Sequence, residues 1–153
     1  MGQTVIARED PRQPDVSGLV YELDRMFEAL YPAESNHLLD IETLARPEVR
    51  FFVVRRDGEA LGCGALWLHA DYGEVKRVYV RPSARGHKLG HLIMRKIEDE
   101  ARALNLPLLR LETGIRQAEA LNLFAATGFA ICSAFGDYPA DDANSVFMEK
   151  RIG

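Results

Sequence analysis

The most informative stretch of this sequence is a turn from Arg85 to Gly90 that combines positive charge with glycine. It follows an apolar run, Val78-Tyr79-Val80, and it precedes a segment with the spacing of an amphipathic helix. Arg85 and Lys88 supply the charge. Free N–H groups at a helix start, with the positive end of the helix dipole behind them, bind phosphate groups. The turn therefore predicts a phosphate site.

The strand before this turn changes phase. Val75 is apolar on one side of the strand, whereas Val78 and Val80 are apolar on the other. An inserted residue shifts the alternation in this way, which predicts a β-bulge near residues 77–79. A bulge leaves a backbone N–H unpaired, and a ligand carbonyl could serve as its partner. In the alternative, Tyr79 is half-exposed and the strand is regular.

The elements around the turn must hold it in place. Their predicted order is one strand, two helices, three antiparallel strands, a helix, a strand, a helix and two strands. Strands are expected at 4–8, 50–55, 60–69, 74–80, 108–112, 130–135 and 145–150, and helices at 15–31, 36–44, 89–104 and 118–126. Asp57-Gly58 between apolar runs predicts a hairpin. The fold class is α/β (α+β), one mixed and mostly antiparallel sheet flanked by helices, in a single domain over residues 1–153.

The composition of the chain limits the classes of molecule that it is expected to bind. The chain has 153 residues and a net charge of −4, which gives no general reason to bind nucleic acid or an acidic membrane. It has no apolar run of membrane-spanning length and no signal-peptide pattern. Cys63 and Cys132 show no CxxC spacing, so we expect reduced thiols and a cytoplasmic protein. His87 and His91 are four apart but lack the glutamate of a zinc-protease motif, so we expect no metal.

The strand, bulge, turn and helix resemble the signature of the GNAT superfamily of N-acetyltransferases, and the order of elements is similar to that fold over nearly the whole chain. In that family the pattern Arg/Gln-x-x-Gly-x-Gly/Ala wraps the diphosphate of acetyl-CoA. Arg85 and Gly90 match this pattern, whereas Lys88 stands at the middle glycine. We expect Lys88 to be tolerated, because a helix-like first turn accepts a side chain there. The segment Ala120 to Phe129 resembles the family's late helix, and the C-terminal run resembles a bacterial branch of unassigned substrate.

The resemblance implies acetyl-CoA as cosubstrate and assigns residues to it. The expected cofactor-binding residues are Val78, Tyr79, Val80, Arg85, Gly86, His87, Lys88, Leu89, Gly90, Asn122 and Phe124. The bulge N–H of Val78 or Tyr79 would bond the thioester carbonyl and its developing negative charge.

The resemblance also implies catalytic residues. Glu74 stands four residues before Val78, where the family often places a carboxylate, and it is the candidate base; a surface glutamate is the alternative. Phe124 replaces the family's usual acid, a tyrosine in the late helix. Tyr138 and Tyr79 are candidate substitutes, although a thiolate can leave without full protonation.

These expectations combine into one predicted function. The chain would be an acetyl-CoA-dependent N-acetyltransferase that moves an acetyl group to an amine, most simply that of a small molecule, by direct attack on the thioester. The alternative is a non-catalytic acyl-CoA-binding module for sensing or assembly, which Phe124 and Lys88 favour. The expected partner is a small-molecule amine, and a homodimer is compatible with so small a domain.

Overall fold

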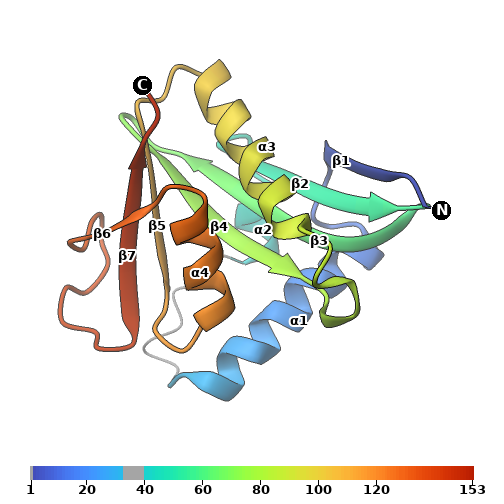
Figure 1. Cartoon of the computed structure of the whole chain (residues 1–153), viewed down its shortest axis with the longest axis horizontal. Coiled ribbons are helices and arrows are strands. Elements are labelled where there is room, and N and C mark those ends of the chain that lie inside the picture. Colours follow the sequence, from blue (N-terminus) through green and yellow to red (C-terminus); the bar gives the residue numbers. More distant parts are fainter. Residues whose placement is uncertain (1, 33–39) are drawn as a thin grey trace.

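The computed structural model describes residues 2–32 and 40–153, and its centre is a seven-stranded sheet with helices on both faces (Figure 1). The strands are β1 (Thr4–Arg8), β2 (Val49–Arg56), β3 (Glu59–Leu68), β4 (Gly73–Val80), β5 (Leu108–Gly114), β6 (Ala130–Cys132) and β7 (Ser145–Arg151). The helices are α1 (Pro14–Leu30), α2 (Ile41–Leu44), α3 (Leu89–Ala103) and α4 (Ala118–Ala126), with a short 3₁₀ turn at Pro82–Ala84. The predicted fold class is confirmed.

The spatial order of the strands is β1-β2-β3-β4-β5-β7-β6. Each neighbouring pair is antiparallel except β4 and β5, which run parallel. The Asp57-Gly58 hairpin is confirmed: both residues have positive φ, 51° and 84°, and Arg56 pairs with Glu59. Such a two-residue loop matches the twist of the flanking strands.

Two expected elements differ from those observed. The helix expected at 36–44 is described only from Ile41, where the Asp40 carboxylate caps it by accepting a hydrogen bond from Thr43 N at 2.8 Å; residues 36–39 lie outside the described part. The strand expected at 130–135 ends at Cys132. Phe135 instead packs edge to face against Tyr72 and Phe147, at ring-centroid distances of 5.7 and 5.6 Å.

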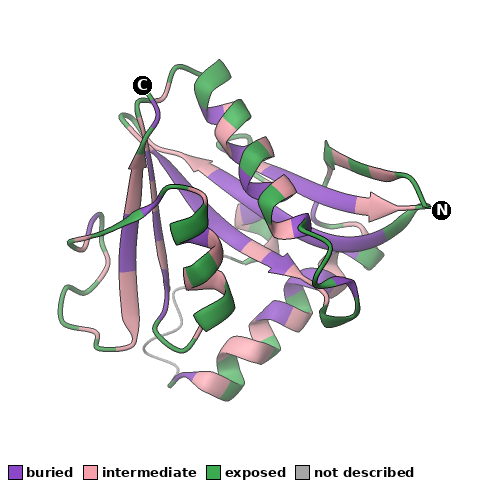
Figure 2. Cartoon of the chain, viewed as in Figure 1, coloured by how far each residue is buried: buried purple, intermediate pink, exposed green. Residues whose placement is uncertain are grey.

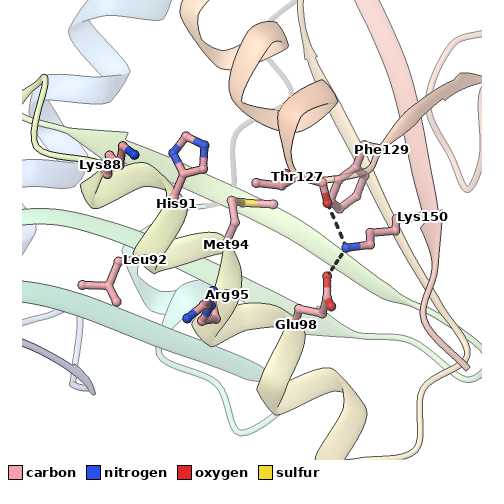
Figure 3. A pocket seen from close by; sticks show the side chains of 9 residues that line it. All are labelled: Lys88, His91, Leu92, Met94, Arg95, Glu98, Thr127, Phe129 and Lys150. Carbon is pink, nitrogen blue, oxygen red and sulfur yellow. Dashed lines mark hydrogen bonds and ion pairs between the residues drawn. The ribbon is translucent and has the colours of Figure 1, made fainter.

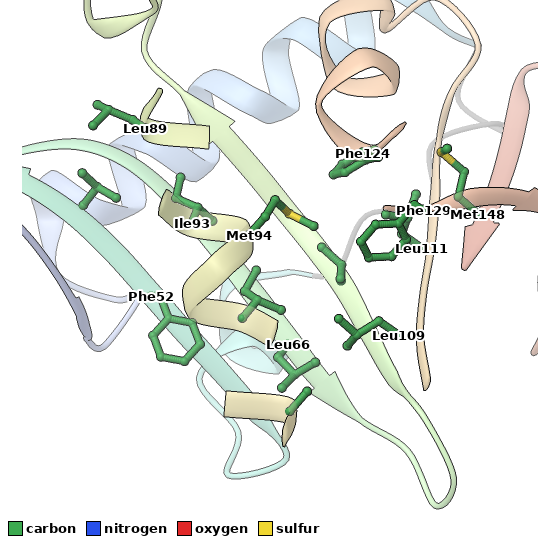
Figure 4. Packing of buried hydrophobic residues seen from close by; sticks show 14 of the residues in the cluster. Phe52, Leu66, Leu89, Ile93, Met94, Leu109, Leu111, Phe124, Phe129 and Met148 are labelled. Carbon is green, nitrogen blue, oxygen red and sulfur yellow. The ribbon is translucent and has the colours of Figure 1, made fainter. Parts of the chain in front are cut away.

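Apolar side chains fill both faces of the sheet. On one face, α3 and α4 cover a cluster that includes Ile93 of α3 (Figure 4). Ile93 and Ile97 are both fully buried in it. On the other face, α1 and α2 cover a cluster that includes Val16 and Leu19. The middle strands carry most of the buried residues (Figure 2). Burial of these side chains supplies the main driving force for the fold.

The sheet opens between β4 and β5. These strands pair at only three positions, where Gly73, Glu74 and Val75 face residues 109–111. Beyond them the strands diverge, so that β4 and β5 together form a V. The open end of this V lies next to the start of α3 and to α4 (Figure 1). On its other side β5 stays paired with β7 along its whole length.

Two further observations bear on the molecule as a whole. Within residues 2–32 and 40–153, no helix has the length and apolar character needed to cross a bilayer. Cys63 is buried and Cys132 is half-buried, and both are free thiols.

Candidate active site

The predicted bulge in β4 is confirmed. The register of β3 on β4 shifts so that two β4 residues, Arg77 and Val78, lie opposite the single residue Gly64. Arg77 has a left-handed φ of 59°, as the first residue of one class of bulge does. Two interactions of Arg77 hold the bulge in place. The Arg77 carbonyl accepts a hydrogen bond from the Cys63 thiol at 3.3 Å, and the Arg77 guanidinium pairs with the Asp24 carboxylate of α1. The regular-strand alternative is wrong.

The turn after β4 is left-handed at two positions. Gly86 has a φ of 88°, and a Cβ added there would meet no atom within 4 Å. Lys88 has a φ of 60° and a ψ of 26° and caps α3, which begins at Leu89. The expectation that Lys88 lies in a helix-like first turn is therefore wrong: it precedes the helix, in a conformation that favours glycine. The first N–H groups of α3 have no partner within the helix.

Arg85 ties this turn to its surroundings. Its Nε donates to the Val80 carbonyl at 3.0 Å, and its guanidinium lies 3.6 Å from the Glu119 carboxylate on α4. The same guanidinium lies 5.9 Å from the centre of the Tyr79 ring. Arg85 thus links the end of β4 with the start of α4 beside the opening of the sheet.

A cavity of about 630 Å³ lies where these parts meet. Most of the sequence-predicted cofactor residues line it, namely Val78, Tyr79, Val80, Arg85, Gly86, Lys88, Leu89 and Gly90. Gln117, directly before α4, forms the opposite wall together with Ala120 and Leu123 of that helix. A Cβ on Gly90 would lie 2.9 Å from Leu123, so glycine allows α3 and α4 to approach closely at this point.

Two predicted cofactor residues lie elsewhere. His87 and Asn122 are exposed, and neither is among the residues that line this cavity. Helix α4 lines the cavity with Ala118, Glu119 and Ala120 of its first turn and with Leu123, whereas Asn122, one turn after Ala118, is not among the lining residues. Phe124 is buried and borders a smaller neighbouring cavity.

The smaller cavity, of about 70 Å³, occupies the gap between β4 and β5. Its walls come from β4, β5, α1 and α4, and consist of Leu23, Met26, Phe27, Val75, Lys76, Arg77, Val78, Leu111, Glu112, Thr113, Gln117, Ala120 and Phe124. Four residues line both cavities, so the large cavity and the gap adjoin each other there: Met26, Val78, Gln117 and Ala120.

Gln117 was not predicted from the sequence. Its side-chain nitrogen Nε2 is buried without a hydrogen-bond partner in the described part of the chain. A buried donor needs an acceptor, so a ligand oxygen in the cleft is a suitable partner. The available signal was its position, since Gln117 is the polar residue directly before α4.

Glu74 is buried rather than on the surface, with 2% of its side chain exposed. Its carboxylate accepts a hydrogen bond from the Tyr138 hydroxyl at 2.5 Å, and His69 Nε2 lies 3.1 Å from its other oxygen. Lys76 Nζ lies 3.4 Å from the carboxylate and donates to the Tyr138 oxygen at 2.6 Å. A carboxylate at this depth requires such partners. The surface-glutamate alternative is wrong, and Glu74 and Tyr138 are brought together as one cluster.

Tyr138 is a weaker acid in this cluster than a tyrosine in water. Burial, and then the charge of Glu74, raise the pKa of its phenol. The rings of Phe135 and Phe147 pack edge to face against it at 5.4 and 5.6 Å, which fixes its orientation. The cluster reaches the gap between the strands through Lys76, which lines the small cavity, whereas Glu74 is not among the residues described as lining it.

A third cavity, of about 460 Å³, lies between α3 and the residues that follow α4, with Lys150 of β7 at its edge (Figure 3). Lys88 and His91 line both this cavity and the large one, so the two are neighbours. Arg95 adds a further positive charge. Lys150 Nζ forms an ion pair with Glu98 Oε1 at 2.5 Å, so its charge is balanced. The surface next to the turn is therefore rich in basic side chains.

Known proteins are similar to this chain in sequence and in fold. The sequence profile of the acetyltransferase (GNAT) family matches residues 17–129. A protein of Azospirillum brasilense named IAA acetyltransferase is 51% identical over 154 residues, which cover 99% of this chain and 100% of that relative.

Two solved structures add to this. A protein of Klebsiella pneumoniae described as an acyl-CoA N-acyltransferase has a TM-score of 0.82 and 35% identity, with 97% of each chain covered. An N-acetyltransferase of Thermoplasma acidophilum in complex with coenzyme A has the same fold, with a TM-score of 0.73, 16% identity and coverage of 98% and 99%. On this evidence the chain belongs to the GNAT family and is an acetyl-CoA-dependent N-acetyltransferase.

Proposed function

We propose that the enzyme transfers the acetyl group directly from the thioester to the primary amine of a small molecule. The observation that carries this proposal is the opening of the sheet between β4 and β5, at a bulge and beside a basic, glycine-containing turn. An extended ligand arm can add to the free edge of β4 as another strand would. The turn then binds the diphosphate end of the ligand, and the bulge contacts its thioester end.

Each part of acetyl-CoA has a proposed place. The diphosphate binds the turn from Arg85 to Gly90 and the start of α3. The nucleotide end extends toward the cavity lined by Lys88, His91 and Arg95, where the positive charges of Lys88 and Arg95 suit a phosphate. The pantetheine arm lies along Val78 and Val80, and Gln117 Nε2 donates to one of its carbonyl oxygens.

The bulge amide of Val78 or Tyr79 stabilises the oxyanion of the tetrahedral intermediate. The departing thiolate needs no dedicated acid, because a free thiol has a pKa of about 8.5. Phe124 at the usual tyrosine position is therefore compatible with turnover. Tyr138 and Glu74 serve the acceptor side, where they connect to the gap through Lys76.

The acceptor enters from the α1 side of the gap. Leu23, Met26 and Phe27 form that wall, which favours a compact amine with an apolar neighbour group. The whole chain, residues 1–153, is proposed as one domain, because both core clusters share the same sheet. A cytoplasmic location and a homodimer stay predictions from the sequence.

The test is amine-dependent release of coenzyme A thiol. The purified enzyme is incubated with acetyl-CoA and, separately, with tryptamine, spermidine or methionine, and free thiol is followed. Thiol release that requires an amine supports transfer. Acetyl-CoA binding without release for any of these amines would instead favour a binding module.

Cosubstrate placement is tested by a matched pair of glycine variants. Gly86 and Gly58 have similar φ values, 88° and 84°, and no atom lies within 4 Å of a Cβ added to either. Gly86→Glu and Gly58→Glu therefore cost similar backbone strain, but only Gly86→Glu adds a negative charge to the proposed diphosphate site. At 100 times its dissociation constant, acetyl-CoA should raise the melting temperature by about 5–10 °C. We expect Gly58→Glu to keep this rise and Gly86→Glu to lose it; equal rises would place the diphosphate elsewhere.

A further inference from the structure

Lys76 is a buried lysine inside the reaction cleft. It lies in β4 directly before the bulge residues, and only 8% of its side chain is exposed. It lines the small cavity in the gap, two residues from Val78. Lysine is rarely buried to this extent, because its charged form loses its hydration there. Its position next to the bulge points to a role in the chemistry.

The neighbours of Lys76 hold its amine in place. Nζ donates to the Tyr138 oxygen at 2.6 Å, and Tyr138 in turn donates to Glu74 at 2.5 Å. Glu74 is fixed by His69 on its other oxygen. The chain His69–Glu74–Tyr138–Lys76 thus runs from a partly exposed histidine to the gap.

The charges that face Lys76 act in opposite directions. Glu74 of its own strand and Glu112 of β5 raise its pKa, whereas Arg77 lowers it. Arg77 is itself paired with Asp24 of α1. Burial is the largest influence, and the net result is a pKa lowered from that of an ordinary lysine. The lowered pKa makes the neutral amine of Lys76 more accessible than that of an exposed lysine.

We propose that Lys76 takes the proton from the ammonium group of the acceptor. This inference rests on the proposed function and adds the identity of the base. Lys76 touches the acceptor and is the catalytic residue, whereas Glu74 and Tyr138 are positioning residues that fix Nζ. Glu74, the base expected from the sequence, acts through them.

The proposed reaction transfers one acetyl group and two protons. The acceptor ammonium gives one proton to the lone pair of Lys76 Nζ, and the neutral amine forms a bond from its nitrogen to the thioester carbon. The tetrahedral intermediate collapses, the carbon–sulfur bond breaks and its electron pair goes to sulfur. The second amine proton neutralises the thiolate. Lys76 returns its proton to water after the products leave.

The first experiment measures the titration of Lys76 directly. The chain contains four lysines, Lys76, Lys88, Lys96 and Lys150, so the carbon spectrum of protein labelled at lysine Cε is simple. Lys76→Met identifies the Lys76 signal by its loss. We expect this signal to titrate at lower pH than the other three. A Lys76 signal that titrates with the others or above them overturns the proposal, and this readout needs no acceptor.

The second experiment compares kinetics as a function of pH, with the fastest amine of the panel. We expect Lys76→Met and Lys76→Arg each to lower kcat/KM at least 100-fold, since arginine cannot accept the proton. Lys96→Met is the matched control, because Lys96 lies on α3 over the Phe52 ring and lines none of the three cavities, and it should keep wild-type kcat/KM. The acidic limb of the wild-type profile should fall at the pH at which the Lys76 signal titrates.

The outcomes separate the two proposals. A wild-type enzyme that releases no thiol with any amine of the panel overturns the proposed function, and with it the role of Lys76. A wild-type enzyme that turns over, with Lys76→Met or Lys76→Arg within threefold of it, overturns the role of Lys76 alone. Retained stabilisation by acetyl-CoA in both variants shows that their loss of activity does not come from misfolding.

Discussion

The left-handed backbone at Lys88 makes a prediction in which conformation and charge can be separated. For a residue other than glycine, this region costs about 1–2 kcal/mol. Lys88→Gly removes that cost, and glycine's greater freedom in the unfolded chain offsets part of the gain. We expect the free energy of unfolding to rise by about 1 kcal/mol, which for a chain of this length raises the melting temperature by about 2–4 °C.

Lys88→Ala is the matched control for the backbone effect. Alanine has a Cβ and keeps the strain, so its melting temperature without ligand should stay close to that of the wild type. Both variants lose the same ammonium group beside the proposed diphosphate site. An exposed cation of this kind contributes about 1 kcal/mol, so both should bind acetyl-CoA about fivefold more weakly.

Differential scanning calorimetry without ligand and titration calorimetry with acetyl-CoA measure the two effects independently. If Lys88→Gly melts no higher than Lys88→Ala, the backbone at this position is not strained, and the reasoning is refuted. If both variants bind acetyl-CoA as tightly as the wild type, the ammonium group does not contact the phosphates.

Three further predictions concern the core, the surface and the missing tyrosine. Gly64→Ala should destabilise the fold by about 1–3 kcal/mol in urea unfolding, because its Cβ would lie 2.4 Å from Ile93 on α3. Glu9→Gln should cost about 1 kcal/mol at pH 7, since two Arg55 hydrogen bonds at 2.9 Å lower the pKa of Glu9. That stability is present above the unfolded pKa of about 4.3 and is lost as pH falls through the lower folded pKa, so the difference between the variants should shrink below pH 4. Phe124→Tyr should leave kcat within about twofold, and a tenfold rise would show that the thiolate needs an acid.

The local features of this fold were predictable from the sequence. The Asp57-Gly58 hairpin follows from its turn chemistry, and the bulge follows from the phase change between Val75 and Val78. Both are decided by residues close together in the chain. The opening between β4 and β5 has no such signal, because its three paired positions each join residues that are 36 apart in the sequence.

Long-range contacts decide the features that the sequence did not predict. Lys76 is buried because Tyr138, 62 positions away, covers it and because β5 places Glu112 nearby. Taken alone, a lysine in a strand is expected on the surface. Asn122 shows the opposite case, since a match to a family pattern does not reveal how far along α4 the cavity extends.

The three-residue seam between β4 and β5 has a mechanical consequence. It leaves strands β5, β6 and β7 attached to the rest of the sheet by few backbone hydrogen bonds. These strands should therefore open locally more often than strands β1 to β4 do. A pantetheine arm lying in the open part of the V would restore the missing strand. The bound cosubstrate would then stabilise the sheet. Amide protons of β5 should exchange with solvent more slowly when acetyl-CoA is bound than when it is absent.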